Sequence, residues 1–161
     1  MNLGGSNGYL TSFYAKGELK SELWGFEVVK KLTWRASLKF STIPKLHFIN
    51  SLDNFDDSKF DAIVDTQCLS YIGDESIMKD LINRLHVVCK SDAKILSVAA
   101  LPYVDNAEDF INTFHLCKFK LLETKPLYFE YFVSPTAFSH CVFQRTSKKP
   151  ITVDTESLDN L

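Results

Sequence analysis

Short apolar runs alternate with segments of helical periodicity along most of this chain, and this alternation constrains the fold most strongly. The predicted strands cover residues 23–29, 46–50, 60–65 and 94–100. Each run is apolar on both sides, as expected of strands that helices cover on both faces of a sheet. Strands that alternate with helices form βαβ units, so the sequence predicts a mainly parallel sheet.

The last two predicted strands, residues 119–123 and 140–144, have no clear helix between them. They are therefore expected to pair as an antiparallel edge of the sheet. The fold class that follows is α/β and doubly wound, with a mainly parallel sheet and an antiparallel C-terminal edge. We expect one domain over residues 1–146, followed by a polar, flexible tail over residues 147–161.

Helical spacing also predicts which side chains of the intervening segments point inward. Three helical segments are concerned, at residues 9–15, 30–38 and 74–88. The residues expected to face inward are Leu10, Phe13, Tyr14, Leu32, Trp34, Ala36, Ile77, Leu81, Leu85 and Val88.

Charge and cysteine content narrow the function classes. The formal net charge is −2 and the basic residues are scattered, so nucleic acid is not indicated as a partner. The four cysteines form no CxxC pair and the histidines complete no zinc pattern, so we expect free thiols and no metal site. No apolar run is long enough to span a membrane and no signal segment opens the chain, so the sequence predicts a cytoplasmic protein.

A glycine-rich segment at the start of the chain is the strongest candidate for ligand binding. Gly4, Gly5 and Gly8 fit a turn between a first strand and a first helix, where glycine reaches positive φ and lets a ligand approach the backbone. Glu27 follows the next strand about twenty residues later, the spacing at which an acid holds ribose hydroxyls in dinucleotide folds. The combination predicts a nucleotide-type binding site.

With these features the chain resembles the class I S-adenosylmethionine-dependent methyltransferases. Residues 2–8, Asn-Leu-Gly-Gly-Ser-Asn-Gly, stand where that family has an acid, an apolar residue and Gly-x-Gly-x-Gly. The order of strands and helices is similar over about residues 2–146. The Gly-Gly-Ser-x-Gly pattern further resembles a bacterial subgroup linked to surface-polysaccharide genes. The resemblance implies the Rossmann-like methyltransferase fold, S-adenosylmethionine as cofactor, and a small-molecule acceptor such as a sugar hydroxyl.

The resemblance also implies roles for individual residues. The loop of Gly4, Gly5, Ser6 and Gly8 would pass under the methionine part of the cofactor, and Glu27 would hold the ribose. Further residues would contact the adenine, or the methionine end and the acceptor. These are Ser51, Leu52 and Asp53 for the adenine, and Asp65 and Gln67 for the methionine end or the acceptor.

Two positions depart from the family pattern. Asn2 replaces the usual acid and removes a charge that organises the amino group of the cofactor. Ser6 replaces the middle glycine and places a Cβ where the backbone approaches the ligand most closely. Both departures bear on the affinity for the cofactor.

Several alternatives remain open from the sequence. Asp65 is either the general base for a hydroxyl acceptor or a strand-end acid that caps the following helix. The chain as a whole is a methyltransferase, a non-catalytic methyltransferase-like binding or assembly module, or a nicotinamide-linked oxidoreductase. The loop fits the oxidoreductase fingerprint poorly. The sequence does not indicate an oligomeric state.

Overall fold

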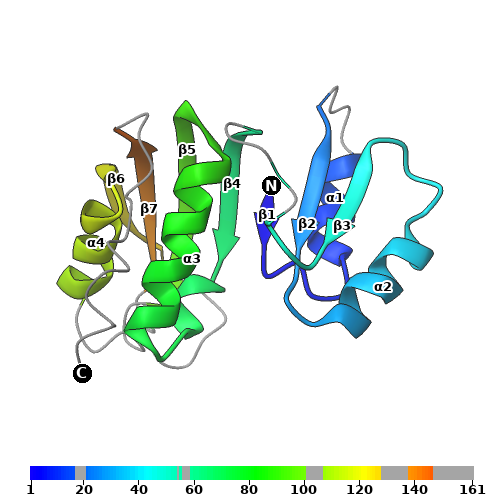
Figure 1. The fold of residues 1–161 in the computed structure, drawn as a ribbon, viewed down its shortest axis with the longest axis horizontal. Helices are drawn as coiled ribbons and strands as arrows, with labels where there is room; N and C mark the ends of the chain where they lie inside the picture. The colour runs from blue at the N-terminus through cyan, green and yellow to red at the C-terminus, as the bar shows by residue number, and fades with distance from the viewer. Residues whose placement is uncertain (17–20, 54, 56–58, 101–106, 128–137, 147–161) are drawn as a thin grey trace, which may run out of the picture.

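The structure is a computed structural model that describes residues 1–16, 21–53, 55, 59–100, 107–127 and 138–146. These residues form one seven-stranded sheet with the order β3-β2-β1-β4-β5-β7-β6 (Figure 1). The strands are β1 (Asn2–Leu3), β2 (Leu23–Phe26), β3 (Leu46–Ile49), β4 (Phe60–Thr66), β5 (Cys89–Ala100), β6 (Phe119–Leu127) and β7 (Phe138–Arg145). The helices are α1 (Tyr9–Lys16), α2 (Lys30–Lys39), the 3-10 helix η1 (Leu69–Tyr71), α3 (Glu75–Val88) and α4 (Ala107–Leu116).

The strand directions confirm the predicted fold class. β1 runs parallel to β2 and to β4, and β4 runs parallel to β5. β7 lies between β5 and β6 and is antiparallel to both. The sheet is thus mainly parallel with an antiparallel edge at its C-terminal side. The predicted tail over residues 147–161 lies outside the described residues and stays a prediction.

The helices are divided between the two ends of the sheet. α1 and α2 lie beside β1, β2 and β3, whereas α3 and α4 lie over β4, β5, β7 and β6 (Figure 1). The chain winds in opposite directions from β1 toward β3 and from β4 toward β5. Right-handed crossovers then place the two helix groups on opposite faces of the sheet. Burial of Leu3, Ile63, Ile95 and Phe143 marks the core under α3 and α4.

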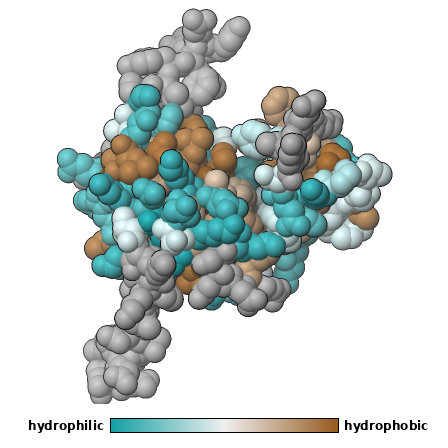
Figure 2. All heavy atoms as spheres, turned by 90° about the horizontal axis from the view of Figure 1, so that it is seen from above, coloured by the Kyte–Doolittle hydropathy of each residue, from teal (hydrophilic) through white to brown (hydrophobic). Residues whose placement is uncertain are grey.

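Three helix faces differ from the prediction, and their outward residues are large and apolar. Trp34 is 62% exposed, Ile77 is 58% exposed and Phe13 is 73% exposed. In α3 the predicted Leu85 and Val88 are buried, but near the start of the helix Met78 is buried in place of Ile77. Figure 2 shows apolar residues at the surface among polar ones.

A polar contact explains the orientation of α1. Asn2 Nδ2 in β1 donates a hydrogen bond to Thr11 Oγ1 at 3.0 Å, and both residues are buried. Gly25 leaves room for Thr11, because a Cβ at Gly25 would lie 3.1 Å from Thr11 Oγ1. The helix therefore packs through Thr11 and turns Leu10 and Phe13 outward.

The four cysteines are free, as predicted. Cys89, Cys117 and Cys141 are buried, and Cys68 is half-buried. Within the part of the chain that the structure describes, no helix is long and apolar enough to cross a membrane.

Candidate functional site

The predicted site residues follow the carboxyl ends of four parallel strands. The glycine loop follows β1, Glu27 follows β2, Ser51 follows β3 and Gln67 follows β4. The chain leaves β1 toward β2 on one side, while β4 lies on the other side of β1. Such a point of divergence is where α/β sheets bind ligands. The sheet therefore brings these four segments to one edge.

Glycine is required at both ends of the loop. Gly4 has φ +64°, and a Cβ there would lie 2.9 Å from the Cβ of Cys68. Gly8 has φ +81°, and a Cβ there would lie 2.7 Å from a ring carbon of Phe48. Gly5 ties the loop to the next strand, because its N–H donates to the carbonyl of Phe26 at 2.9 Å. The loop is thus tightly fitted at Gly5 and Gly8, which are buried, and exposed at Gly4 and Ser6, where a ligand could approach the backbone.

Ser6 has the conformation that the replaced glycine would adopt. Its φ is +45°, in the left-handed region that disfavours residues with a Cβ. The side chain is exposed, so the substitution meets no packing obstacle in the protein itself. Ser6 therefore preserves the backbone path of the loop at a cost in backbone strain.

Glu27 joins the glycine loop to the start of α2. The N–H of Ser6 donates to Glu27 Oε2 at 3.0 Å, and the N–H of Val29 donates to Oε1 at 3.0 Å. Each carboxylate oxygen accepts one of these bonds and keeps a further lone pair. The half-buried carboxylate can therefore still accept hydrogen bonds from a ligand such as a diol.

Asn2 is buried beneath the loop and retains an acceptor. Its Nδ2 is used by Thr11, whereas its Oδ1 is buried without a hydrogen-bond partner among the described residues. Buried polar atoms are usually satisfied. An unsatisfied oxygen at this place leaves acceptor capacity where the family has a carboxylate.

The three residues that were expected beside the adenine, Ser51, Leu52 and Asp53, differ in their exposure to solvent. Ser51 Oγ donates a hydrogen bond to Asp53 Oδ2 at 2.8 Å. Asp53 is exposed and Ser51 is half-buried. Asp53 also forms an ion pair with Arg84 at 2.8 Å. Leu52 is buried and packs in the hydrophobic core. Ser51 is therefore more accessible to a ligand than Leu52 is.

Asp65 has no exposed surface. Its Oδ2 accepts a hydrogen bond from Ser97 Oγ at 2.6 Å, and its Oδ1 accepts one from the N–H of Leu69 at 3.1 Å. Burial raises the pKa of the Asp65 carboxyl, and these hydrogen bonds act in the opposite direction. A general base must reach the proton that it removes, so this geometry does not favour the base role that we considered for Asp65.

Gln67 and Cys68 form the turn that follows β4. Gln67 is half-buried with φ +67°, and its N–H donates to the carbonyl of Val98 at 2.9 Å. Burial raises the pKa of the Cys68 thiol to about 12, so the thiol is a poor nucleophile at neutral pH. Cys68 instead packs against Gly4 and forms part of the floor of the loop.

Two residues of the site, Ser97 and Phe48, were not predicted from the sequence. Ser97 is a hydroxyl in the otherwise apolar run Ile95–Ala99, and this interruption was the available signal. Its register position opposite Asp65 depends on how β4 and β5 pair, which the sequence pattern leaves open. Phe48 closes on Gly8 from β3, a contact between segments that are forty residues apart.

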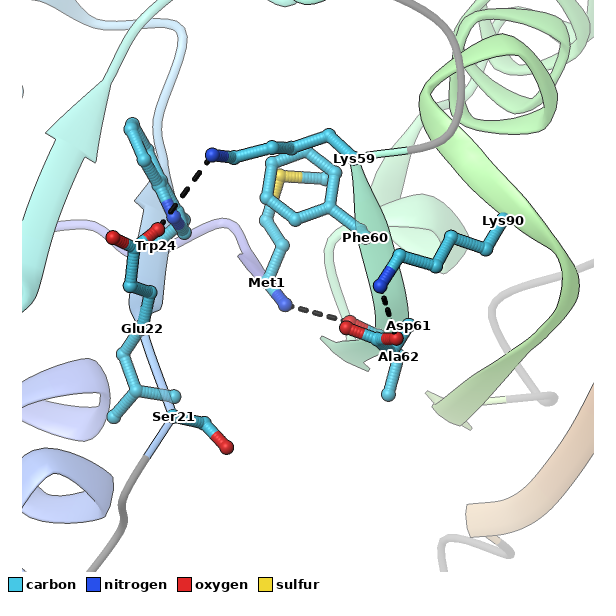
Figure 3. Close-up of a pocket in the computed structure, with 10 residues that line it drawn as sticks. Met1, Ser21, Glu22, Trp24, Lys59, Phe60, Asp61, Ala62 and Lys90 are labelled. Carbon is cyan, nitrogen blue, oxygen red and sulfur yellow. Dashed lines mark hydrogen bonds and ion pairs between the residues drawn. The ribbon is translucent and has the colours of Figure 1, made fainter.

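A separate cavity of about 500 Å³ lies at the opposite edge of the sheet, between the starts of β2 and β4 (Figure 3). Lys59 reaches across it toward Glu22, with 3.6 Å between the charged groups. Lys90 and Asp61 form a second ion pair at 2.5 Å. The glycine loop and Glu27 are not among its lining residues. No group of three or more potential metal ligands occurs among the residues that the structure describes.

No family model matches the chain, and no curated protein matches it in sequence. Many solved structures match it in fold. An S-adenosylmethionine-dependent methyltransferase from Methanosarcina mazei aligns with a TM-score of 0.72 and 14% identity, covering 90% of this chain and 91% of its own. The N-methyltransferase NodS from Bradyrhizobium japonicum, in complex with S-adenosylhomocysteine, gives 0.71 and 15%, covering 91% and 76%.

A TehB-like S-adenosylmethionine-dependent methyltransferase from Corynebacterium glutamicum aligns similarly, with a TM-score of 0.69, 14% identity and coverage of 90% and 78%. The chain has the fold of these methyltransferases. The expected Rossmann-like methyltransferase fold is thereby confirmed. At these identities the likeness concerns the fold, and the chemistry has to be argued from the site.

Proposed function

We propose that this protein binds S-adenosylmethionine at the carboxyl edge of its sheet and transfers the methyl group to a small-molecule acceptor. The observation that carries the proposal is the joint placement of the left-handed glycine loop and Glu27, linked through the N–H of Ser6 at 3.0 Å. The site combines a close backbone approach with a carboxylate that can accept a ribose diol. The fold neighbours, one of which holds S-adenosylhomocysteine, support the choice of ligand.

The residues present fit this cofactor. Gly4 and Gly8 hold the loop in its left-handed path against Cys68 and Phe48, where neither position has room for a Cβ. Asn2 Oδ1, buried beneath the loop, has no hydrogen-bond partner among the described residues. In the proposed arrangement Gly4, Gly5, Ser6 and Gly8 pass under the methionine part. Glu27 accepts the ribose hydroxyls, and Ser51 and Gln67 border the site. The bound cofactor would supply an activated methyl group on its sulfonium.

The acceptor that we propose is a hydroxyl group of a sugar-like small molecule, on the basis of the family resemblance of the loop. Transfer from a sulfonium depends mainly on alignment of donor and acceptor, so the reaction does not require a buried base. Four free thiols fit a reducing compartment, and we propose a cytoplasmic location.

Isothermal titration calorimetry with S-adenosylhomocysteine tests the proposal through the Glu27→Ala variant. Loss of charge-assisted hydrogen bonds of roughly 1.5–3 kcal/mol is expected to weaken binding by about tenfold or more. Glu22→Ala is the matched control, because Glu22 lines the cavity at the other edge of the sheet. We expect the control to bind like the unmodified protein.

A folded protein that binds neither S-adenosylmethionine nor S-adenosylhomocysteine would contradict the enzyme assignment. The departures at Asn2 and Ser6 would then favour the alternative of a non-catalytic methyltransferase-like binding module. Equal loss of affinity in the Glu27 and Glu22 variants would contradict the location of the site.

A further inference from the structure

Asp65 and Ser97 form a buried polar pair inside the sheet. The two residues are direct neighbours in the register of β4 and β5, and neither has any exposed surface. Ser97 Oγ lies 2.6 Å from Asp65 Oδ2. A hydroxyl and a carboxylate are costly to bury unless they are hydrogen-bonded, and here each supplies a partner for the other.

The second oxygen of Asp65 fixes the turn that follows β4. Oδ1 accepts the N–H of Leu69 at 3.1 Å, four residues further along the chain. Within this turn Gln67 has φ +67°, a conformation that is costly for a residue with a Cβ. The bond from the N–H of Gln67 to the carbonyl of Val98 at 2.9 Å secures the turn from β5 as well.

The turn at residues 67–69 also supports the glycine loop. Cys68 lies between Gln67 and Leu69 and packs so closely under Gly4 that a Cβ on Gly4 would lie 3.2 Å from the Cys68 Sγ. A displacement of the turn would therefore move the floor of the loop. The contacts form a continuous path from Ser97 through Asp65 and the 67–69 turn, which contains Cys68, to Gly4.

We propose that Asp65 is a positioning residue: the Asp65–Ser97 pair holds the 67–69 turn as the floor on which the cofactor loop rests. The inference rests on the proposed function for its effect on cofactor binding, and it replaces the role of general base. An amide can bridge the same two partners: its oxygen accepts the Leu69 N–H, and its nitrogen donates to the Ser97 oxygen, which reverses the direction of that bond. Geometry, not charge, is then the property that matters at position 65.

The test combines two measurements on Asp65→Ala, Asp65→Asn and the control Thr66→Ala, whose side chain is exposed on the same strand. Calorimetry gives the Kd of S-adenosylhomocysteine, and hydrogen exchange gives the protection of the Leu69 amide without ligand. We expect Asp65→Ala to raise Kd about tenfold and to speed exchange at Leu69. Asp65→Asn and Thr66→Ala are expected to stay within about threefold of the unmodified protein in Kd.

Unchanged Kd and unchanged Leu69 protection in Asp65→Ala would overturn the inference, as would an Asp65→Asn variant that loses as much affinity as Asp65→Ala. If Asp65→Ala does not fold, Ser97→Ala replaces it, with an expected rise in Kd of about threefold and an unchanged Kd as the contrary result. If the unmodified protein binds no S-adenosylhomocysteine, the proposed function fails. Exchange at Leu69 then decides alone whether Asp65 anchors the turn.

Discussion

At the scale of single residues, Gly8 meets two independent constraints. Its φ of +81° disfavours a Cβ, and that atom would approach Phe48 to 2.7 Å and Ala36 to 2.9 Å. We predict that Gly8→Ala lowers the free energy of unfolding by about 2–5 kcal/mol, from backbone strain together with overpacking. Urea denaturation measures the change.

Gly73→Ala is the matched control, because a Cβ at Gly73 has no neighbour within 4 Å. Its effect is expected to lie within about 0.5 kcal/mol of zero or to be slightly stabilising. Equal destabilisation by the two alanine substitutions would contradict the close fit of the loop.

Ser6 carries strain that a glycine would not. Replacing Ser6 by glycine relieves roughly 1–2 kcal/mol of left-handed strain in the folded state. It also raises the conformational entropy of the unfolded chain, which costs about 0.4–1 kcal/mol of stability. We therefore predict that Ser6→Gly raises the free energy of unfolding by up to about 1.6 kcal/mol in urea denaturation. Asn7→Gly is the control: its φ is not positive, so about 0.5–1 kcal/mol of stability should be lost. A loss of the same size at Ser6 would show that Ser6 is not strained.

At the scale of elements, α3 depends on its N-terminal cap. Asp74 Oδ1 accepts the N–H groups of Ser76 and Ile77 at 2.9 and 3.2 Å. The hydrogen bond from the Ser76 hydroxyl and these backbone bonds lower the pKa of the Asp74 carboxyl. The carboxylate therefore stabilises the fold above its ordinary pKa, and this contribution is lost as the pH falls through the lowered value.

We predict that Asp74→Ala lowers the melting temperature at pH 7 and that the difference from the unmodified protein shrinks in acid. Thermal unfolding between pH 7 and pH 3 provides the measurement. Asp80→Ala removes an exposed acid from the same helix without removing the cap and should have little effect. A difference that grows as the pH falls would contradict the capping role.

The elements also show where sequence patterns suffice and where they do not. Helical spacing correctly placed α3 between its cap and β5, but it assigned Ile77 to the core in place of Met78. For Phe13 and Trp34 the pattern favoured burial, and both are exposed. A short helix offers more than one apolar stripe, and the choice depends on contacts with other strands, such as the one from Asn2 to Thr11.

At the scale of the whole molecule, the order of apolar runs and helical segments was enough to predict the sheet, because crossover rules leave few arrangements. The family resemblance implied that Gly4, Glu27, Ser51 and Gln67 border one ligand, and the strand order brings their segments to the same edge of the sheet. It could not predict that Asp65 is fully buried, since that depends on the pairing with Ser97 in β5. Strand register is a tertiary property that an apolar run alone does not specify.

The carboxyl ends and the amino ends of the parallel strands form two edges of the sheet, and these edges differ in what they can bind. The carboxyl edge carries the glycine loop and Glu27, whereas the amino edge carries a cavity lined by paired charges (Figure 3). We propose that S-adenosylmethionine binds at the carboxyl edge only. A crystal structure of the protein with S-adenosylhomocysteine decides between the edges. We predict the ligand along Gly4–Gly8 with its ribose hydroxyls on Glu27; a ligand in the amino-edge cavity, or one that leaves Glu27 without contact, would contradict the account.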